Sequence, residues 1–233
     1  ARFVKPINVI ELLFSLEKFP YLSSSSVPTN HKSIEASKNE IASQSTDNNA
    51  EPTMSVNTQI DTTQIFFWAH SNGGQIVLSV LEALSKPIPS SLWAPVSAPF
   101  PYSILFFTRT DVDEGKEARA WLAMFEREYD VLDFSATQHL NRLTAPIQIH
   151  HGTQDQDALW VWSQSLCEMI ELENKTRHEE QSDLNPIFYT LFLYPGADHN
   201  LQPNSHWSQA IQRDLDFYQS FRQLSSKTPL SLL

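Results

Sequence analysis

The sequence has one cysteine, no long apolar run and few basic residues, and each shortage argues against a class of protein. Cys167 stands alone, so no disulfide can form within the chain. No apolar stretch approaches the roughly 20 residues that a membrane-spanning helix needs, and residues 9–14 are too short for a signal peptide. A formal charge of −11 argues against a nucleic-acid surface. We therefore expect a cytoplasmic protein without membrane or nucleic-acid partners.

Length and composition suit one sizeable core. The 233 residues are 41% hydrophobic and 11% aromatic. Apolar side chains at helical spacing over residues 5–19 predict an amphipathic helix that ends before Pro20. A later stretch is rich in Ser, Thr, Asn and Gln and contains no aromatic residue, which predicts disorder. The expected organisation is an N-terminal helical segment (1–22), a disordered insertion (23–59), a structured core (60–225) and a tail (226–233).

The core alternates short apolar runs with helical patterns, which is typical of an α/β fold with a parallel sheet. Strands are expected at residues 65–69, 91–94, 147–150 and 187–193. Helices are expected at residues 75–84, 115–129, 135–143, 159–172 and 207–224. The helical stretch 110–143 separates the second of these strands from the third.

The first strand of the core ends in a polar, glycine-rich turn. Ile65–Ala69 is continuously apolar, His70-Ser71-Asn72-Gly73-Gly74 follows, and a helical pattern begins directly afterwards. A serine between a strand and a helix, at a sharp turn, is the local pattern of a nucleophile elbow. The turn therefore predicts Ser71 as the nucleophile of a serine hydrolase.

A serine nucleophile needs a histidine base and a carboxylate, which in this kind of sheet follow in the order acid, then histidine. Asp155 closes His151-Gly152-Thr153-Gln154-Asp155, after the third predicted strand. His199 closes Gly196-Ala197-Asp198-His199, after the fourth. Loops at the carboxyl ends of parallel strands build sites in such folds. The sequence thus supplies both partners in the required order.

These three motifs together resemble the prolyl oligopeptidase-like branch of the α/β-hydrolases, from about residue 61 to residue 218. The resemblance implies an α/β-hydrolase-like three-layer sandwich with a mostly parallel sheet. It assigns Ser71 as nucleophile, Asp155 as acid and His199 as base, and suggests the backbone N–H of Asn72 as an oxyanion donor. It implies acyl transfer on a small peptide or ester, without metal or organic cofactor. Such folds carry caps where the helical stretch 110–143 lies, so the resemblance also suggests that this stretch forms a cap that controls substrate access. A peptidase is favoured, and a carboxylesterase is the alternative.

Several neighbouring groups have other interpretations. Asp157 is an alternative acid, whereas Asp198, adjacent to His199, is expected to be a loop or capping residue. A metal site made of His150, His151 and Asp155 is disfavoured, because no second ligand cluster has suitable spacing. His150 and His151 are expected to pack or to hydrogen-bond, and Cys167 to be a buried structural residue. His70 flanks Ser71 but is not placed to act as the base. The aromatic cluster is expected to belong to the core instead of forming a ligand platform: Trp160, Trp162 and Trp207.

The match departs from the resembled pattern in three places. Ala69 stands where Gly is usual, and Ala158-Leu159 stands where Val-Pro is usual. More seriously, the strands that precede the elbow in the resembled fold, with their second oxyanion donor, have no counterpart before residue 60. An open sheet edge is then expected, and with it possible self-association. A truncated, non-catalytic fragment that acts as a binding module is therefore a second hypothesis.

Overall fold

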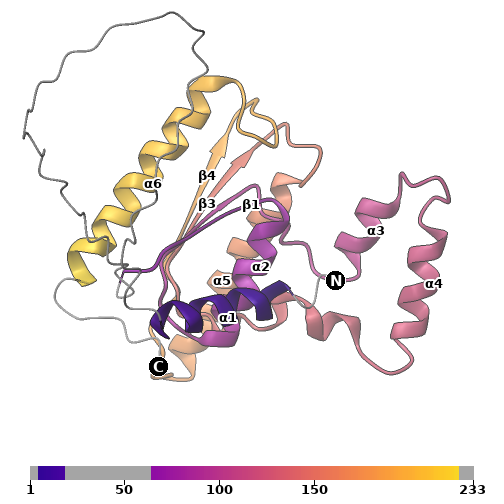
Figure 1. The fold of residues 1–233 in the computed structure, drawn as a ribbon, viewed down its shortest axis with the longest axis horizontal. Helices are drawn as coiled ribbons and strands as arrows, with labels where there is room; N and C mark the ends of the chain where they lie inside the picture. The colour runs from indigo at the N-terminus through magenta and orange to yellow at the C-terminus, as the bar shows by residue number, and fades with distance from the viewer. Residues whose placement is uncertain (1–4, 19–63, 226–233) are drawn as a thin grey trace, which may run out of the picture.

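The computed structural model describes residues 5–18 and 64–225, and its centre is a sheet of four strands (Figure 1). All three strand pairs are parallel, and the strands lie side by side in chain order. The strands are β1 (Phe67–His70), β2 (Ser90–Trp93), β3 (Ile147–Gly152) and β4 (Tyr189–Tyr194). The parallel sheet that the alternating pattern predicted is therefore confirmed.

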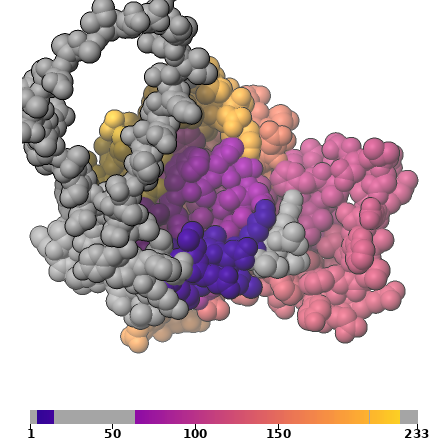
Figure 2. Space-filling model, in the orientation of Figure 1, coloured from indigo at the N-terminus to yellow at the C-terminus, as the bar shows by residue number. Residues whose placement is uncertain are grey.

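Two helices cover one face of the sheet. They are α2 (Asn72–Leu84), which lies on β1 and β2, and α5 (Trp160–Glu179), which lies on β3 and β4. α1 (Lys5–Lys18) packs against the outside of α2, as the space-filling view shows (Figure 2). The apolar stripes of α2 and α5 meet the sheet in one core, which includes Leu78, Leu81, Leu92, Ile147, Ile149, Leu166 and Ile170. Cys167 is buried in the same core, as predicted.

The other face is covered by α6 (Asn204–Ser225) and has a polar centre. β3 is buried along its whole length, so the side chains of Gln148 and His150 need partners inside the protein. Both donate to the carboxylate of Asp214 on α6, at 2.9 Å and 3.0 Å. α6 is thereby fixed to the sheet by hydrogen bonds as well as by apolar contacts.

Between β2 and β3 the chain forms α3 (Tyr102–Thr108), α4 (Lys116–Phe125) and short 3₁₀ turns. α3 and α4 stand apart from the sheet in Figure 1. The predicted helix at 135–143 is wrong, because this stretch forms two 3₁₀ turns instead. The two turns are separated at His139, whose backbone (φ −120°, ψ 19°) leaves the helical range, and the Arg177 guanidinium of α5 donates to the carbonyl groups of Leu140, Asn141 and Leu143 at the end of the stretch. The cap function of residues 110–143 stays a prediction.

The tryptophans do not form one core cluster. Trp162 of α5 packs against Phe106 of α3 at 4.8 Å between ring centroids. Trp207 of α6 lies elsewhere, against Trp93, and is 46% exposed. The prediction that Trp207 is a core residue is therefore wrong.

β1 forms one edge of the sheet in the described part of the chain. Phe67 and Ser71 donate their backbone N–H groups to Pro89 and Trp93, on the β2 side. Because successive N–H groups of a strand point to opposite sides, those of Trp68 and His70 point to the outer edge. The predicted insertion at 23–59 and tail at 226–233 lie outside the described residues. Among residues 5–18 and 64–225, no helix combines the length and apolarity that a bilayer span requires.

Candidate active site

Ser71 sits in a strained turn between β1 and α2. Its backbone has φ 55° and ψ −124°, a region that non-glycine residues rarely adopt. Hydrogen bonds hold it there: its N–H donates to Trp93 O at 2.9 Å, and its carbonyl accepts from Gly74 N and Val96 N, both at 3.0 Å. A Cβ on Gly74 would lie 2.5 Å from the Pro95 side chain, so only glycine fits there. The backbone of residue 71 has the sharp strand-to-helix turn of a nucleophile elbow.

The departure at Ala69 is accommodated. Ala69 is buried in β1, and its methyl group lies at an ordinary contact distance, 3.5 Å, from the place that a Cβ on Gly73 would take. Asn72 is the first residue of α2, where backbone N–H groups have no acceptor within the helix. The same helix end carries a partial positive charge from the helix dipole. The N–H of Asn72 thus lies at a helix end that favours an anionic oxygen, and its role as an oxyanion donor stays a prediction.

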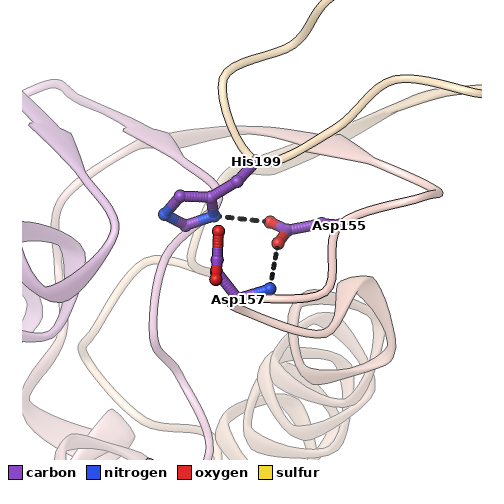
Figure 3. A group of neighbouring side chains, drawn as sticks. All are labelled: Asp155, Asp157 and His199. Atoms are coloured by element: carbon purple, nitrogen blue, oxygen red, sulfur yellow. Dashed lines mark hydrogen bonds and ion pairs between the residues drawn. The ribbon is translucent and has the colours of Figure 1, made fainter.

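The structure brings Asp155 and His199 into direct contact (Figure 3). His199 Nδ1 donates to Asp155 Oδ2 at 2.7 Å. The second nitrogen of the His199 ring faces away from Asp155. The Asp155 side chain is fully buried, whereas that of His199 retains 14% exposure. This pairing fixes one tautomer of the imidazole and leaves its other nitrogen able to take a proton.

Asp155 is an ionised carboxylate at neutral pH. Burial raises the pKa of Asp155, but hydrogen bonds from His151, His199 and the Ala158 N–H outweigh it and hold this pKa well below its ordinary value. The hydrogen bond to Asp155 in turn raises the pKa of His199. The two shifts share one cause, because the bond is strongest between a carboxylate and an imidazolium.

The loops that carry Asp155 and His199 are joined through their backbones. Thr153 N–H donates to Tyr194 O at 3.0 Å, and Gln154 N–H donates to Ala197 O at 2.8 Å. A Cβ on Gly152 would lie 2.3 Å from the carbonyl oxygen of Ala197, so the close approach requires glycine at this position. The Asp–His distance is therefore set by main-chain contacts.

The alternative acids do not occupy the position of Asp155. Asp157 is exposed, and its backbone N–H donates to Asp155 Oδ1 at 2.8 Å. Asp198 accepts the N–H groups of Asn200 and Gln202, both at 2.9 Å, which is the loop-capping role expected of it.

His150 and His151 hydrogen-bond inside the protein, as predicted. His151 Nε2 contacts two acceptors, Asp155 Oδ2 at 3.1 Å and Ala158 O at 2.9 Å, and Nδ1 contacts the Ser163 hydroxyl at 2.7 Å. His151 is thus a second histidine on the Asp155 carboxylate, a contact that sequence reasoning missed. The spacing of four residues in one turn after a strand was the available signal.

His70 is a further residue whose contact the sequence did not reveal. Its Nε2 donates to the backbone carbonyl of His199 at 2.9 Å, and the two rings lie 4.6 Å apart between centroids. His70 thereby links the end of the strand before Ser71 to the loop that carries His199. The Ser71 hydroxyl has no hydrogen bond to the His199 ring in the described part of the chain.

The oxygen and nitrogen atoms of Asp155, Asp157 and His199 lie within 4.8 Å of one another and could hold a metal ion. This set differs from His150, His151 and Asp155, which the sequence analysis considered. The Asp155 oxygens already accept hydrogen bonds from two histidines and two backbone N–H groups. The contacts around this carboxylate are therefore those of a histidine-orienting acid rather than of a metal ligand.

Comparison with solved structures identifies the fold. A Mycobacterium tuberculosis puromycin-hydrolyzing peptidase is 14% identical at a TM-score of 0.50, over 68% of this chain and 22% of its own. Porphyromonas gingivalis dipeptidyl peptidase 4 is 17% identical at a TM-score of 0.50, over 69% of this chain and 20% of its own. Neither a scan of protein-family models nor a search of curated proteins found a match.

This chain spans about a fifth of the length of each of these two peptidases. At such identities the likeness concerns the arrangement of strands and helices alone. Together with the parallel sheet, the helices on both of its faces and the turn at Ser71, it establishes that the chain has an α/β-hydrolase-like fold.

Proposed function

We propose that the protein is a serine hydrolase that cleaves a small peptide or ester by acyl-enzyme chemistry. The observation that carries the proposal is the 2.7 Å bond between Asp155 and His199, in loops that follow neighbouring parallel strands of the sheet that holds Ser71 in its strained turn. Carboxyl ends of parallel strands share one edge of a sheet, which supports the assignment of the three side chains to one site.

In the proposed reaction Ser71 Oγ attacks the substrate carbonyl while His199 Nε2 takes the hydroxyl proton. Asp155 keeps the proton on Nδ1 and stabilises the imidazolium that forms. The Asn72 N–H donates to the oxyanion. His199 then returns the proton to the leaving group, and water releases the acyl group from Ser71 by the same steps. No metal or organic cofactor is required.

Labelling with a fluorophosphonate probe tests this assignment. We expect the wild type to be labelled, Ser71→Ala to be unlabelled, and Ser165→Ala, a change of an exposed serine on α5, to be labelled like the wild type. An unlabelled wild type, or equal labelling of Ser71→Ala, contradicts the proposal.

A peptidase is favoured within this class, since both structural relatives are named as peptidases. The carboxylesterase alternative predicts turnover of a 4-nitrophenyl ester without turnover of an aminoacyl 4-nitroanilide. Measuring both substrates with the same preparation separates the two activities.

The non-catalytic alternative rests on β1, which has no outer neighbour among residues 5–18 and 64–225 and where Trp68 is 56% exposed. It predicts an unlabelled protein that associates with itself through this edge. Sedimentation velocity of the wild type and of Trp68→Lys tests it, because a charge on an edge strand opposes pairing.

A further inference from the structure

Aromatic side chains line a cavity between β1 and α6, on the α6 face of the sheet. Its volume is about 400 Å³, and its lining includes Trp68, Trp93, Trp207, Tyr218 and the carboxylate of Asp214. Trp68 and Trp93 come from neighbouring strands, and Trp207, Asp214 and Tyr218 come from α6. We refer to this space as the aromatic cavity.

The three indole rings line the aromatic cavity but leave it open to the solvent. Trp93 makes edge contacts with Trp68, at 5.6 Å between centroids, and with Trp207, at 6.2 Å. Trp93 is buried, but Trp68 is 56% exposed and Trp207 is 46% exposed. Three π systems therefore line one cavity, and two of them are open to the solvent.

Asp214 adds a negative charge to this wall. It is 6% exposed, and it accepts hydrogen bonds from the uncharged donors Ser91, Trp93 and Gln148. His150 Nε2 bonds to the same carboxylate at 3.0 Å. Three of the four contacts are made to Oδ1 and the Trp93 contact to Oδ2, so these partners use most of the acceptor capacity of the carboxylate. Ser91, Trp93 and Gln148 are neutral donors and do not cancel the charge of the carboxylate, and His150 offsets it only when its ring is protonated.

We propose that the aromatic cavity binds an organic cation of the quaternary ammonium type. Such a cation has no N–H group to satisfy, and it is attracted both by aromatic faces and by a nearby negative charge. The overall charge of −11 likewise favours a positively charged ligand. The Asp214 carboxylate would repel an anion, and a neutral apolar ligand would gain no attraction from the charge of this carboxylate.

The aromatic cavity adjoins the candidate active site. His70 and Asn200, the chain neighbours of Ser71 and His199, also line it. A cation bound there lies beside the proposed catalytic residues. Binding itself does not depend on the proposed hydrolysis, so its test is separate from the labelling experiment.

Choline and its uncharged carbon isostere, 3,3-dimethyl-1-butanol, provide a matched pair of probes. Three of the six tryptophans line the cavity, so intrinsic fluorescence reports on occupancy. In a titration at pH 8 and low salt we expect choline to bind at least about tenfold more tightly than the isostere. Equal affinities, or no change in fluorescence with choline, overturn the proposal.

Variants locate the binding. Trp68→Leu and Trp207→Leu remove exposed π faces without emptying the core, and each should weaken choline binding by about fivefold or more. Trp121→Leu is the control, because Trp121 lies on α4 and is 62% exposed. Calorimetry with choline avoids any dependence on the fluorescence of the replaced residue. Unchanged affinity in both cavity variants, with far-UV circular dichroism intact, excludes the aromatic cavity as the site.

Discussion

Replacing Glu82 by Gln should stabilise the protein at neutral pH. Glu82 lies on α2, the helix that follows Ser71, and is 3% exposed. Its Oε1 has no hydrogen-bond partner in the described part of the chain. Burial raises the pKa of Glu82 from 4.5 to about 9, against the opposing effect of the positive charge of Arg142.

The sign follows from the two states. The folded protein keeps a proton on Glu82 that the unfolded chain releases above pH 4.5, so the free energy of unfolding falls between pH 4.5 and 9. Each pH unit in this range costs about 1.4 kcal/mol, which gives a cost of about 3 kcal/mol at pH 7 and about 6 kcal/mol at pH 9. Gln has the same shape and no ionisation, so Glu82→Gln should remove this cost.

Urea unfolding of wild type and Glu82→Gln at pH 5, 7 and 9 measures the effect. The difference in free energy of unfolding should be below about 1 kcal/mol at pH 5 and should grow at each step. Glu128→Gln, at an exposed position after α4, is the control and should show no such trend. A constant difference between Glu82→Gln and wild type at the three pH values would refute the reasoning.

Three further predictions concern the site and its support. The hydrogen bond to Asp155 raises the pKa of His199, so kcat/KM should fall on acidification with a midpoint above about pH 6.5. A lower midpoint in the pH–rate profile would contradict the role of His199 as the base. Asp155→Asn should lower kcat about 10⁴-fold, and unchanged steady-state kinetics would refute this. Because folding depresses the pKa of Asp155, the same variant should also lack the part of the folding stability that the wild type loses as pH falls below about 4. Acid unfolding identical to that of the wild type would refute this second effect. Arg177→Met should lower the free energy of unfolding, measured in urea, by about 3–5 kcal/mol, because the buried guanidinium pairs with Glu173 and bonds several carbonyl groups. A loss below about 1 kcal/mol would show that these contacts are replaceable.

The elements that sequence predicted well are those with strong local signals. Ile65–Ala69 is a continuous apolar run and becomes β1, an edge strand that is only partly buried, whereas Ile147–His150 alternates apolar and polar residues and becomes β3, which is buried throughout. The bounds of both strands shift by a residue or two. The turn at Ser71 could be predicted because the serine stands between an apolar run and a helical pattern and is followed by glycines, of which Gly74 leaves no room for a side chain. Asp155 and His199 were predictable as partners since each follows a strand of the same parallel sheet.

The misses have different causes. The stretch 135–143 has helical spacing, yet its backbone leaves helical values at His139, and Arg177, more than thirty residues later, binds the carbonyl groups at its end. The apolar residues of α3 run only from Ile104 to Phe107, which is too short a run to show a helical period. Trp207 was expected in the core because it is a large aromatic residue, but on α6 it lines the aromatic cavity beside β1 and is 46% exposed.

The backbone contact at Gly152 has a consequence for how the site can change. Because the loops bearing Asp155 and His199 are bonded main chain to main chain, we expect them to move together. Ser71 is held to the same sheet through β2, since its N–H donates to Trp93 O and the Ala94 N–H donates to His150 O. The His70 bond to the His199 carbonyl adds a direct link between the end of β1 and the loop that carries His199. Transplanting this chemistry into another sheet would require moving residues 152–155 and 194–199 together, as a single part.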